Sequence, residues 1–201
     1  MNKRERSIVY GSILGDAFIQ PTGKKNARIR LEHGARQKEY ILWKWQELKR
    51  YMQRQPTYLD RFNPIWRKRY AYYRCQSHAS PEFGKLRLLF YQDNKKIIPD
   101  AIGKILSDPL TLAVWFMDDG YYYGRDKTAY IYLSKLSPRD VSKLQTALEK
   151  NFKLATKLEI KKTGAMNLKF GAAETKKLVD VIAPHVIEGM RYKIGEEPRI
   201  D

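Results

Sequence analysis

The sequence predicts an α+β fold built from two pseudo-symmetric halves, and three observations support this prediction. Two apolar segments, residues 8–16 and 111–120, resemble one another, and each leads to an acid, Asp16 or Asp119. The two acids lie 103 positions apart in a chain of 201 residues, close to half its length. Helical and alternating segments follow each motif in a similar order. We therefore expect an N-terminal lobe over residues 1–100 and a C-terminal lobe over residues 101–201.

Hydrophobic periodicity and cap residues predict the elements of the first half. In order, they are a helix over 4–16, a strand over 27–32, an amphipathic helix over 36–53, turns over 55–64, a strand over 67–77 and a helix from Ser80 to about residue 91. Ser80 is the predicted N-cap of that last helix, and Pro81 occupies its first turn.

The second half has a similar order, α-β-α-β-β-α, after a boundary at about 97–108. Its predicted elements are a helix from Asp108 to Asp119, a strand over 127–134, a helix from Ser137 to about 151, strands over 158–161 and 166–170, and a helix over 173–183. Thr163 and Gly164 predict a hairpin between its last two strands.

The charge of the chain points to a polyanionic partner. Lys and Arg number 39 against 22 Asp and Glu, which gives a net charge of +17 and a pI near 9.8. Such an excess favours nucleic acids through counterion release. A ribosomal-type protein or a merely basic surface are the alternatives. Fourteen tyrosines argue against a disordered basic tail.

Several classes of protein are excluded by composition. No apolar run of about 18 residues predicts a membrane span, and no signal-peptide pattern is present. Cys75 is the single cysteine, so an internal disulfide is excluded. The three histidines, His33, His78 and His185, have no metal-ligand spacing. We therefore expect an intracellular protein that is neither secreted nor membrane-bound.

Gly11 and Gly15 lie four positions apart on one face of the first motif helix. Each glycine costs about 1 kcal/mol relative to alanine inside a helix, so two on one stripe predict a close helix partner. The partner stripe expected in the second motif is Ala113, Val114 and Met117.

Close packing of the motif helices would place Asp16 and Asp119 side by side at helix C-termini. A helix C-terminus carries partial negative charge, so carboxylates there favour a cation. Paired carboxylates in a strongly basic protein predict divalent metal ions acting on a nucleic-acid backbone. The alternative is that the acids face solvent beyond the helix ends. Asp118 is a second candidate ligand beside Asp119.

The two motifs resemble those of LAGLIDADG homing endonucleases in their monomeric two-motif form, and the second is especially similar to that of a yeast mitochondrial intron-encoded member. Residues 94–99 and 189–193 resemble the segments that supply a lysine to each half of the active site. By this resemblance Lys96 and Lys193 are the basic catalytic residues, 80 positions after Asp16 and 74 after Asp119. Ala17 departs from the glycine that usually closes the motif.

The resemblance implies two αββαββα lobes packed through their motif helices, with the β-sheets forming a saddle on DNA. It implies a site-specific double-stranded DNA endonuclease that leaves short 3′ overhangs. Asp16 and Asp119 would bind Mg²⁺, for which Mn²⁺ could substitute, and act in catalysis with Lys96 and Lys193. The implied partner is double-stranded DNA with a long specific target, bound by a monomer. A maturase or regulator without cleavage, with intron RNA as its partner, is the alternative.

Alternating positions on the predicted strands carry long polar and aromatic side chains, typical of a sheet that contacts base edges and phosphates. The alternative is an ordinary solvated sheet face. The predicted DNA-binding residues are Arg28, Arg30, Lys68, Tyr70, Tyr72, Arg74, Gln76, Tyr130, Tyr132, Asn167 and Lys169.

Overall fold

The computed structural model describes residues 1–65, 67–133 and 135–196. The chain divides into two compact units. The motif-helix unit combines Met1–Gly15 with Phe90–Asp201, and the inserted unit comprises Asp16–Leu89. Each unit contains a four-stranded antiparallel sheet together with helices.

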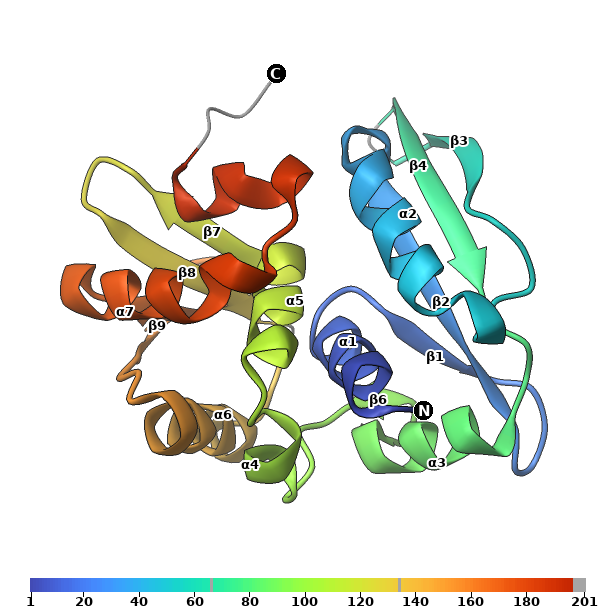
Figure 1. Ribbon diagram of the computed structural model, residues 1–201, viewed down its shortest axis with the longest axis horizontal. Coiled ribbons are helices and arrows are strands. Elements are labelled where there is room, and N and C mark those ends of the chain that lie inside the picture. The colour runs from blue at the N-terminus through green and yellow to red at the C-terminus, as the bar shows by residue number, and fades with distance from the viewer. Residues whose placement is uncertain (66, 134, 197–201) are drawn as a thin grey trace. The chain divides into compact units, whose positions relative to one another are not determined.

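The inserted unit contains one sheet in the order β1-β2-β4-β3 (Figure 1). Its elements are β1 (Phe18–Pro21), β2 (Ala27–Gly34), η1 (Ala35–Gln37), α2 (Lys38–Glu47), η2 (Lys49–Tyr51), β3 (Thr57–Asn63), β4 (Lys68–Gln76) and α3 (Pro81–Phe90). Ile29 and Leu31 of β2 are buried, whereas Arg28 and Arg30 alternate with them on the more exposed face. The period-2 pattern of β2 therefore decides which face is polar.

The motif-helix unit contains a second sheet in the order β7-β8-β10-β9. Its elements are α1 (Lys3–Leu14), β5 (Tyr91–Gln92), β6 (Lys95–Lys96), α4 (Ile102–Ile105), α5 (Pro109–Asp119), β7 (Gly120–Tyr123), β8 (Thr128–Leu133), α6 (Pro138–Phe152), β9 (Lys157–Ile160), β10 (Met166–Phe170), α7 (Ala172–Ile182), η3 (Ala183–His185) and η4 (Glu188–Ile194). The order αββαββα occurs twice, from α1 to α3 and from α5 to α7. The predicted α+β class and internal repeat are confirmed.

Five strands, β1, β3, β5, β6 and β7, were absent from the elements predicted by hydrophobic patterns. β5 and β6 have only two residues each, too few for any pattern. The stretch 55–64 was predicted as turns, but it contains β3. Its strand is exposed along most of its length and lies at the sheet edge, so it carries no buried stripe that periodicity could detect. β1 and β7 are four residues each, too short to establish a period. The predicted helix over 36–53 is α2 flanked by two 3-10 turns.

The motif helices α1 and α5 lie side by side in the motif-helix unit (Figure 1). An added Cβ at Gly11 would lie 2.6 Å from the Thr111 carbonyl oxygen and 2.7 Å from the Val114 Cβ. One at Gly15 would lie 2.4 Å from the Asp118 Cβ. The glycines therefore permit the close approach, as predicted. Of the predicted partner stripe, Val114 is among these nearest neighbours, while Thr111 and Asp118 supply the others.

α5 is the most apolar helix and is buried on all sides. Its residues from Leu112 to Met117 are each at most 1% exposed. Asp108 caps its N-terminus by accepting a hydrogen bond from the Leu110 backbone N–H at 2.9 Å, and Pro109 starts its first turn. Among the described residues, no helix is long and apolar enough to cross a membrane.

Candidate metal and nucleic-acid sites

The C-terminal ends of α1 and α5 both lead into an acid. Asp119 is the last residue of α5, and Asp16 follows Gly15, the C-cap of α1. Neither helix has a basic residue in its own last turn. Any positive charge that compensates the negative end of either helix dipole must therefore come from another segment of the chain.

Two lysines from distant segments supply that positive charge in the motif-helix unit. The Lys96 Nζ donates to the Gly15 carbonyl oxygen at 2.7 Å. The Lys193 Nζ donates to the Asp118 carbonyl oxygen at 2.9 Å. Gly15 and Asp118 are the residues that immediately precede the two motif acids, so the two lysines occupy equivalent positions in the repeat.

The hairpin that carries Lys96 is set by local turn chemistry. β5 and β6 pair Tyr91 with Lys96, and Asp93 and Asn94 connect them with φ of 48° and 61°. Two successive left-handed residues of the Asn/Asp type form the tight hairpin loop that the strand twist favours. The adjacent Lys95 is exposed, so the turn directs Lys96 rather than Lys95 to the helix end.

Lys193 lies in the 3-10 helix η4. The neighbouring basic residue, Arg191, pairs instead with Glu188 at 3.3 Å and with Glu196. The two basic residues of this segment therefore have different partners, and Lys193 is the one at the end of α5.

Asp118 and Asp119 differ in environment. Asp118 is 9% exposed, and its Cβ faces the space left by Gly15. Asp119 is half-buried and lines a cavity of about 460 Å³. The other lining residues are Asp118, Gly120, Tyr121, Tyr122, Tyr132, Tyr192 and Lys193. Both acids therefore line this cavity, but Asp118 is buried and also packs against Gly15, whereas Asp119 is half-buried.

The oxygen atoms at these helix ends suit a hard divalent cation. Carboxylate and backbone carbonyl oxygens are the ligands that Mg²⁺ and Ca²⁺ prefer, and both kinds occur at the end of each motif helix. Histidine and cysteine, which favour zinc and copper, are absent from the described lining of the Asp119 cavity.

Asp16 belongs to the inserted unit, where His33 lies beside it. The His33 Nδ1 is 3.8 Å from the Asp16 Oδ2, and the Asp16 side chain is 48% exposed while that of His33 is 1% exposed. The His33 Nε2 lies 3.1 Å from the Nζ of Lys44, which is fully buried. Sequence reasoning missed His33, because its place on β2 follows the buried positions Ile29 and Leu31 and indicates only a core residue.

The exposed face of the β1–β4 sheet combines arginines with aromatic rings. The strand register puts Arg30 opposite Gln76 and Glu32 opposite Arg74, so the side chains of each pair share a face. Arg74 donates from Nε to Glu32 at 2.7 Å and lies 5.5 Å from the centre of the Tyr72 ring. The predicted residues Arg28, Arg30, Tyr70, Tyr72, Arg74 and Gln76 are partly or fully exposed on this sheet, as is Lys68 at its end.

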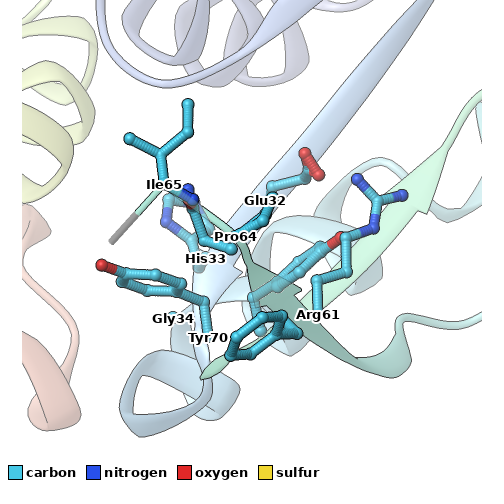
Figure 2. Close-up of a pocket in the computed structure, with 10 residues that line it drawn as sticks. Glu32, His33, Gly34, Arg61, Pro64, Ile65 and Tyr70 are labelled. Carbon is cyan, nitrogen blue, oxygen red and sulfur yellow. The ribbon is translucent and has the colours of Figure 1, made fainter. Parts of the chain in front are cut away.

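A pocket lies on this sheet near the β3–β4 turn (Figure 2). It has a volume of about 490 Å³ and is lined by Glu32, His33, Gly34, Arg61, Phe62, Asn63, Pro64, Ile65, Tyr70 and Tyr72. Phe62 and Ile65 are 57% and 84% exposed, so apolar side chains form part of its accessible lining. Sequence reasoning did not identify this pocket, since its lining comes from three separate strands.

The β7–β10 sheet brings together four other predicted DNA-binding residues. Tyr130 pairs with Lys169, and Tyr132 pairs with Asn167. The Lys169 ammonium lies 3.0 Å from Glu159, and the hydrogen bond with Glu159 raises the pKa of Lys169 above its usual range. Asn167 is 1% exposed, and its buried Oδ1 has no hydrogen-bond partner within the described ranges. Tyr132 is exposed and Tyr130 and Lys169 are half-buried, whereas Asn167 is covered.

Residues 6–178 match the LAGLIDADG DNA endonuclease family, and the chain belongs to that family. It is 27% identical to the protein RecA of Mycolicibacterium flavescens, over 96% of this chain and 47% of that protein. It spans about half the length of most of the RecA proteins that it matches.

Two shorter relatives have different stated roles. The cytochrome b mRNA maturase bI2 of Debaryomyces hansenii is 27% identical, over 97% of this chain and 75% of that protein. The probable intron-encoded endonuclease 1 of Wickerhamomyces canadensis is 26% identical, over 96% of this chain and 85% of that protein.

Solved structures share the fold. The homing endonuclease I-WcaI bound to its DNA recognition sequence matches with a TM-score of 0.87 and 24% identity, over 96% of this chain and 86% of that chain. I-DmoI in complex with DNA and Mn matches with a TM-score of 0.50 and 13% identity, over 89% of this chain and 96% of that chain. At these identities the likeness establishes the fold.

Proposed function

We propose that this chain is a site-specific double-stranded DNA endonuclease that requires a divalent metal ion and leaves short 3′ overhangs. The observation that carries the proposal is the repeated arrangement at the helix ends. Lys96 donates to the carbonyl before Asp16, and Lys193 donates to the carbonyl before Asp119. A repeated acid and lysine suit an enzyme that acts on two strands, with one set of residues for each.

In this proposal Asp16 and Asp119 hold Mg²⁺, or Mn²⁺ in its place, through their carboxylates. The bound ion would polarise a scissile phosphate and help to generate the attacking hydroxide. Each carbonyl bond holds a lysine ammonium at the residue that precedes the corresponding acid. That positive charge would offset the negative charge that develops on the phosphate during attack. Asp118 stays a packing residue, because its Cβ faces Gly15.

Target recognition is assigned to the exposed faces of the two sheets. Arginine and lysine side chains there would contact phosphates and guanine edges, while the aromatic rings contact sugars and thymine methyl groups. The close Arg74–Glu32 pair gives Arg74 a fixed direction, which base recognition needs more than phosphate attraction does. A net charge of +17 supplies the long-range attraction to DNA. A protein of this kind would act as a monomer, since both motifs lie in one chain.

The test is incubation with Mg²⁺ and a pool of genomic and randomised duplexes, followed by sequencing of the DNA ends. A long recurring site with staggered 3′ ends is the expected product. Asp16→Asn and Asp119→Asn should each abolish double-strand cleavage while DNA affinity, measured in Ca²⁺, is retained. Asp180→Asn, an exposed acid on α7, is the matched control and should cut normally. Loss of DNA affinity in both motif variants, with the fold intact, would argue against a metal-binding role.

A second candidate function is assistance of intron RNA splicing without DNA cleavage. The maturase relative favours it, because it matches nearly the whole of this chain. This function predicts no enrichment of DNA ends, together with tight binding of a structured intron RNA. Retention of that RNA binding in the Asp16→Asn variant would distinguish it from the nuclease.

A further inference from the structure

A buried lysine and histidine lie behind Asp16 in the inserted unit. Lys44 of α2 and His33 of β2 are 0% and 4% exposed. The Lys44 Nζ is 3.1 Å from the His33 Nε2 and 4.4 Å from the centre of the Tyr40 ring. The Tyr40 ring in turn lies 4.7 Å from the His33 ring. Burying an ammonium is costly unless polar or aromatic groups surround it, and His33 and Tyr40 are two such groups here.

The contact with Lys44 bears on the tautomer of His33. With Lys44 as an ammonium, which has three donors and no acceptor, the His33 Nε2 is the acceptor of this contact. A neutral imidazole that accepts at Nε2 carries its proton on Nδ1. The His33 Nδ1 is the atom 3.8 Å from the Asp16 Oδ2. The ring nitrogen that carries the proton is therefore the one nearer the Asp16 carboxylate, at a distance longer than a direct hydrogen bond.

We propose that His33, oriented by Lys44, is a positioning residue that holds the Asp16 carboxylate in the direction needed for metal binding. This inference rests on the proposed nuclease function. The described lining of the cavity at Asp119 includes four tyrosines and Lys193 but no histidine. The His33–Lys44 pair therefore acts on Asp16 and not on Asp119. Mutation of His33 or Lys44 should consequently slow the cleavage of one DNA strand more than that of the other.

The first test reads the tautomer directly and needs no nuclease activity. Long-range ¹H–¹⁵N correlations of the full chain should show His33 with its proton on Nδ1 and a bare Nε2. The Lys44→Met variant, which keeps the length of the side chain and loses its donor, should alter this pattern. A proton on Nε2 in the wild-type protein would overturn the inference.

The second test separates a hydrogen-bond donor from simple packing. The side-chain nitrogen of asparagine can take the place of the His33 Nδ1, whereas leucine fills the buried space without a donor. His33→Leu should slow cleavage of one strand by about 10-fold or more, as loss of a ligand-orienting partner does. His33→Asn should retain more of that rate. A packing role predicts the reverse order, since leucine suits a buried site better.

The affected strand is identified as the one whose cleavage Asp16→Asn abolishes. Differently labelled strands on a single-site duplex give the two rates, and nicked product should accumulate with His33→Leu. His78→Leu, at an exposed histidine of the same unit, is the control and should cut both strands normally. Equal slowing of both strands by His33→Leu, or faster cutting by the leucine variant than by the asparagine variant, would refute the proposal.

A double-mutant cycle tests the role of Lys44. Lys44→Met should slow the same strand, and it should have little further effect when His33 is already leucine, because the two act in series. Additive losses would overturn the coupling. Failure of the wild-type protein to cut any DNA overturns the proposed nuclease function instead, while the tautomer measurement still decides how His33 is oriented.

Discussion

Replacement of Gly11 by alanine tests the close contact between α1 and α5. The added Cβ would lie 2.6 Å from the Thr111 carbonyl oxygen and 2.7 Å from the Val114 Cβ, both closer than real Cβ contacts allow. One neighbour is backbone and the other is the branch point of a β-branched side chain, so neither can rotate away. The two helices would have to separate.

The magnitude follows from two opposing effects. Alanine gains about 1 kcal/mol over glycine in helix propensity. Overpacking a well-packed core costs typically about 1–3 kcal/mol, and this rigid contact belongs at the upper end of that range. The net expectation for Gly11→Ala is a destabilisation of about 2 kcal/mol, or a fall in Tm of about 4–8 °C for a chain of this size.

The assay is urea unfolding followed by circular dichroism and by fluorescence of the tryptophans, which include Trp115, buried in α5. Gly103→Ala is the matched control, because Gly103 lies in α4 and an added Cβ there would meet nothing within 4 Å. That control should be neutral or stabilising by up to about 1 kcal/mol. If Gly11→Ala proves as stable as Gly103→Ala, the helices are not in the contact described and the reasoning is wrong.

Three further predictions concern other parts of the chain. Burial raises the pKa of the Cys75 thiol to about 12, so at pH 8 the folded protein should react with a thiol reagent about a thousandfold more slowly than the unfolded chain; equal rates would contradict its burial. Lys143 hydrogen-bonds Asp100 at 2.8 Å and lowers the pKa of that carboxyl, so Lys143→Met should raise it toward the ordinary value in an NMR titration, and an unchanged pKa would exclude the pairing. The logarithm of the DNA affinity should fall steeply as the logarithm of the salt concentration rises. Arg30→Ala should reduce the magnitude of this slope by about one, which corresponds to one phosphate contact. An unchanged slope would show that Arg30 does not neutralise a phosphate.

Local signals predicted many elements closely. Ser137 and Pro138 predicted the start of α6, and Ser137 accepts a hydrogen bond from the Asp140 N–H at 3.1 Å. Gly164 was predicted in a hairpin turn, and it has a φ of 81° between β9 and β10. These predictions succeed because caps and turns depend on residues a few positions apart.

The strands that were not predicted show which elements such local signals fail to identify. β3 lies between Pro56 and Pro64, and its pairing with β4 holds it extended although its own residues are mostly exposed. A sequence pattern identifies a strand by the buried apolar residues on one of its faces, and an exposed edge strand has too few of them. Pairing with β4, the next strand along the chain, determines its conformation.

The sequence by itself determined the internal repeat, the basic character of the chain, the two motif acids and the glycines that let the motif helices approach. Each of these is a local pattern or a count. Only the tertiary structure decided that Asn167 is covered and that His33 lies between Lys44 and Asp16. Such placements depend on chain turns and on packing between distant segments, and no local pattern of residues encodes them.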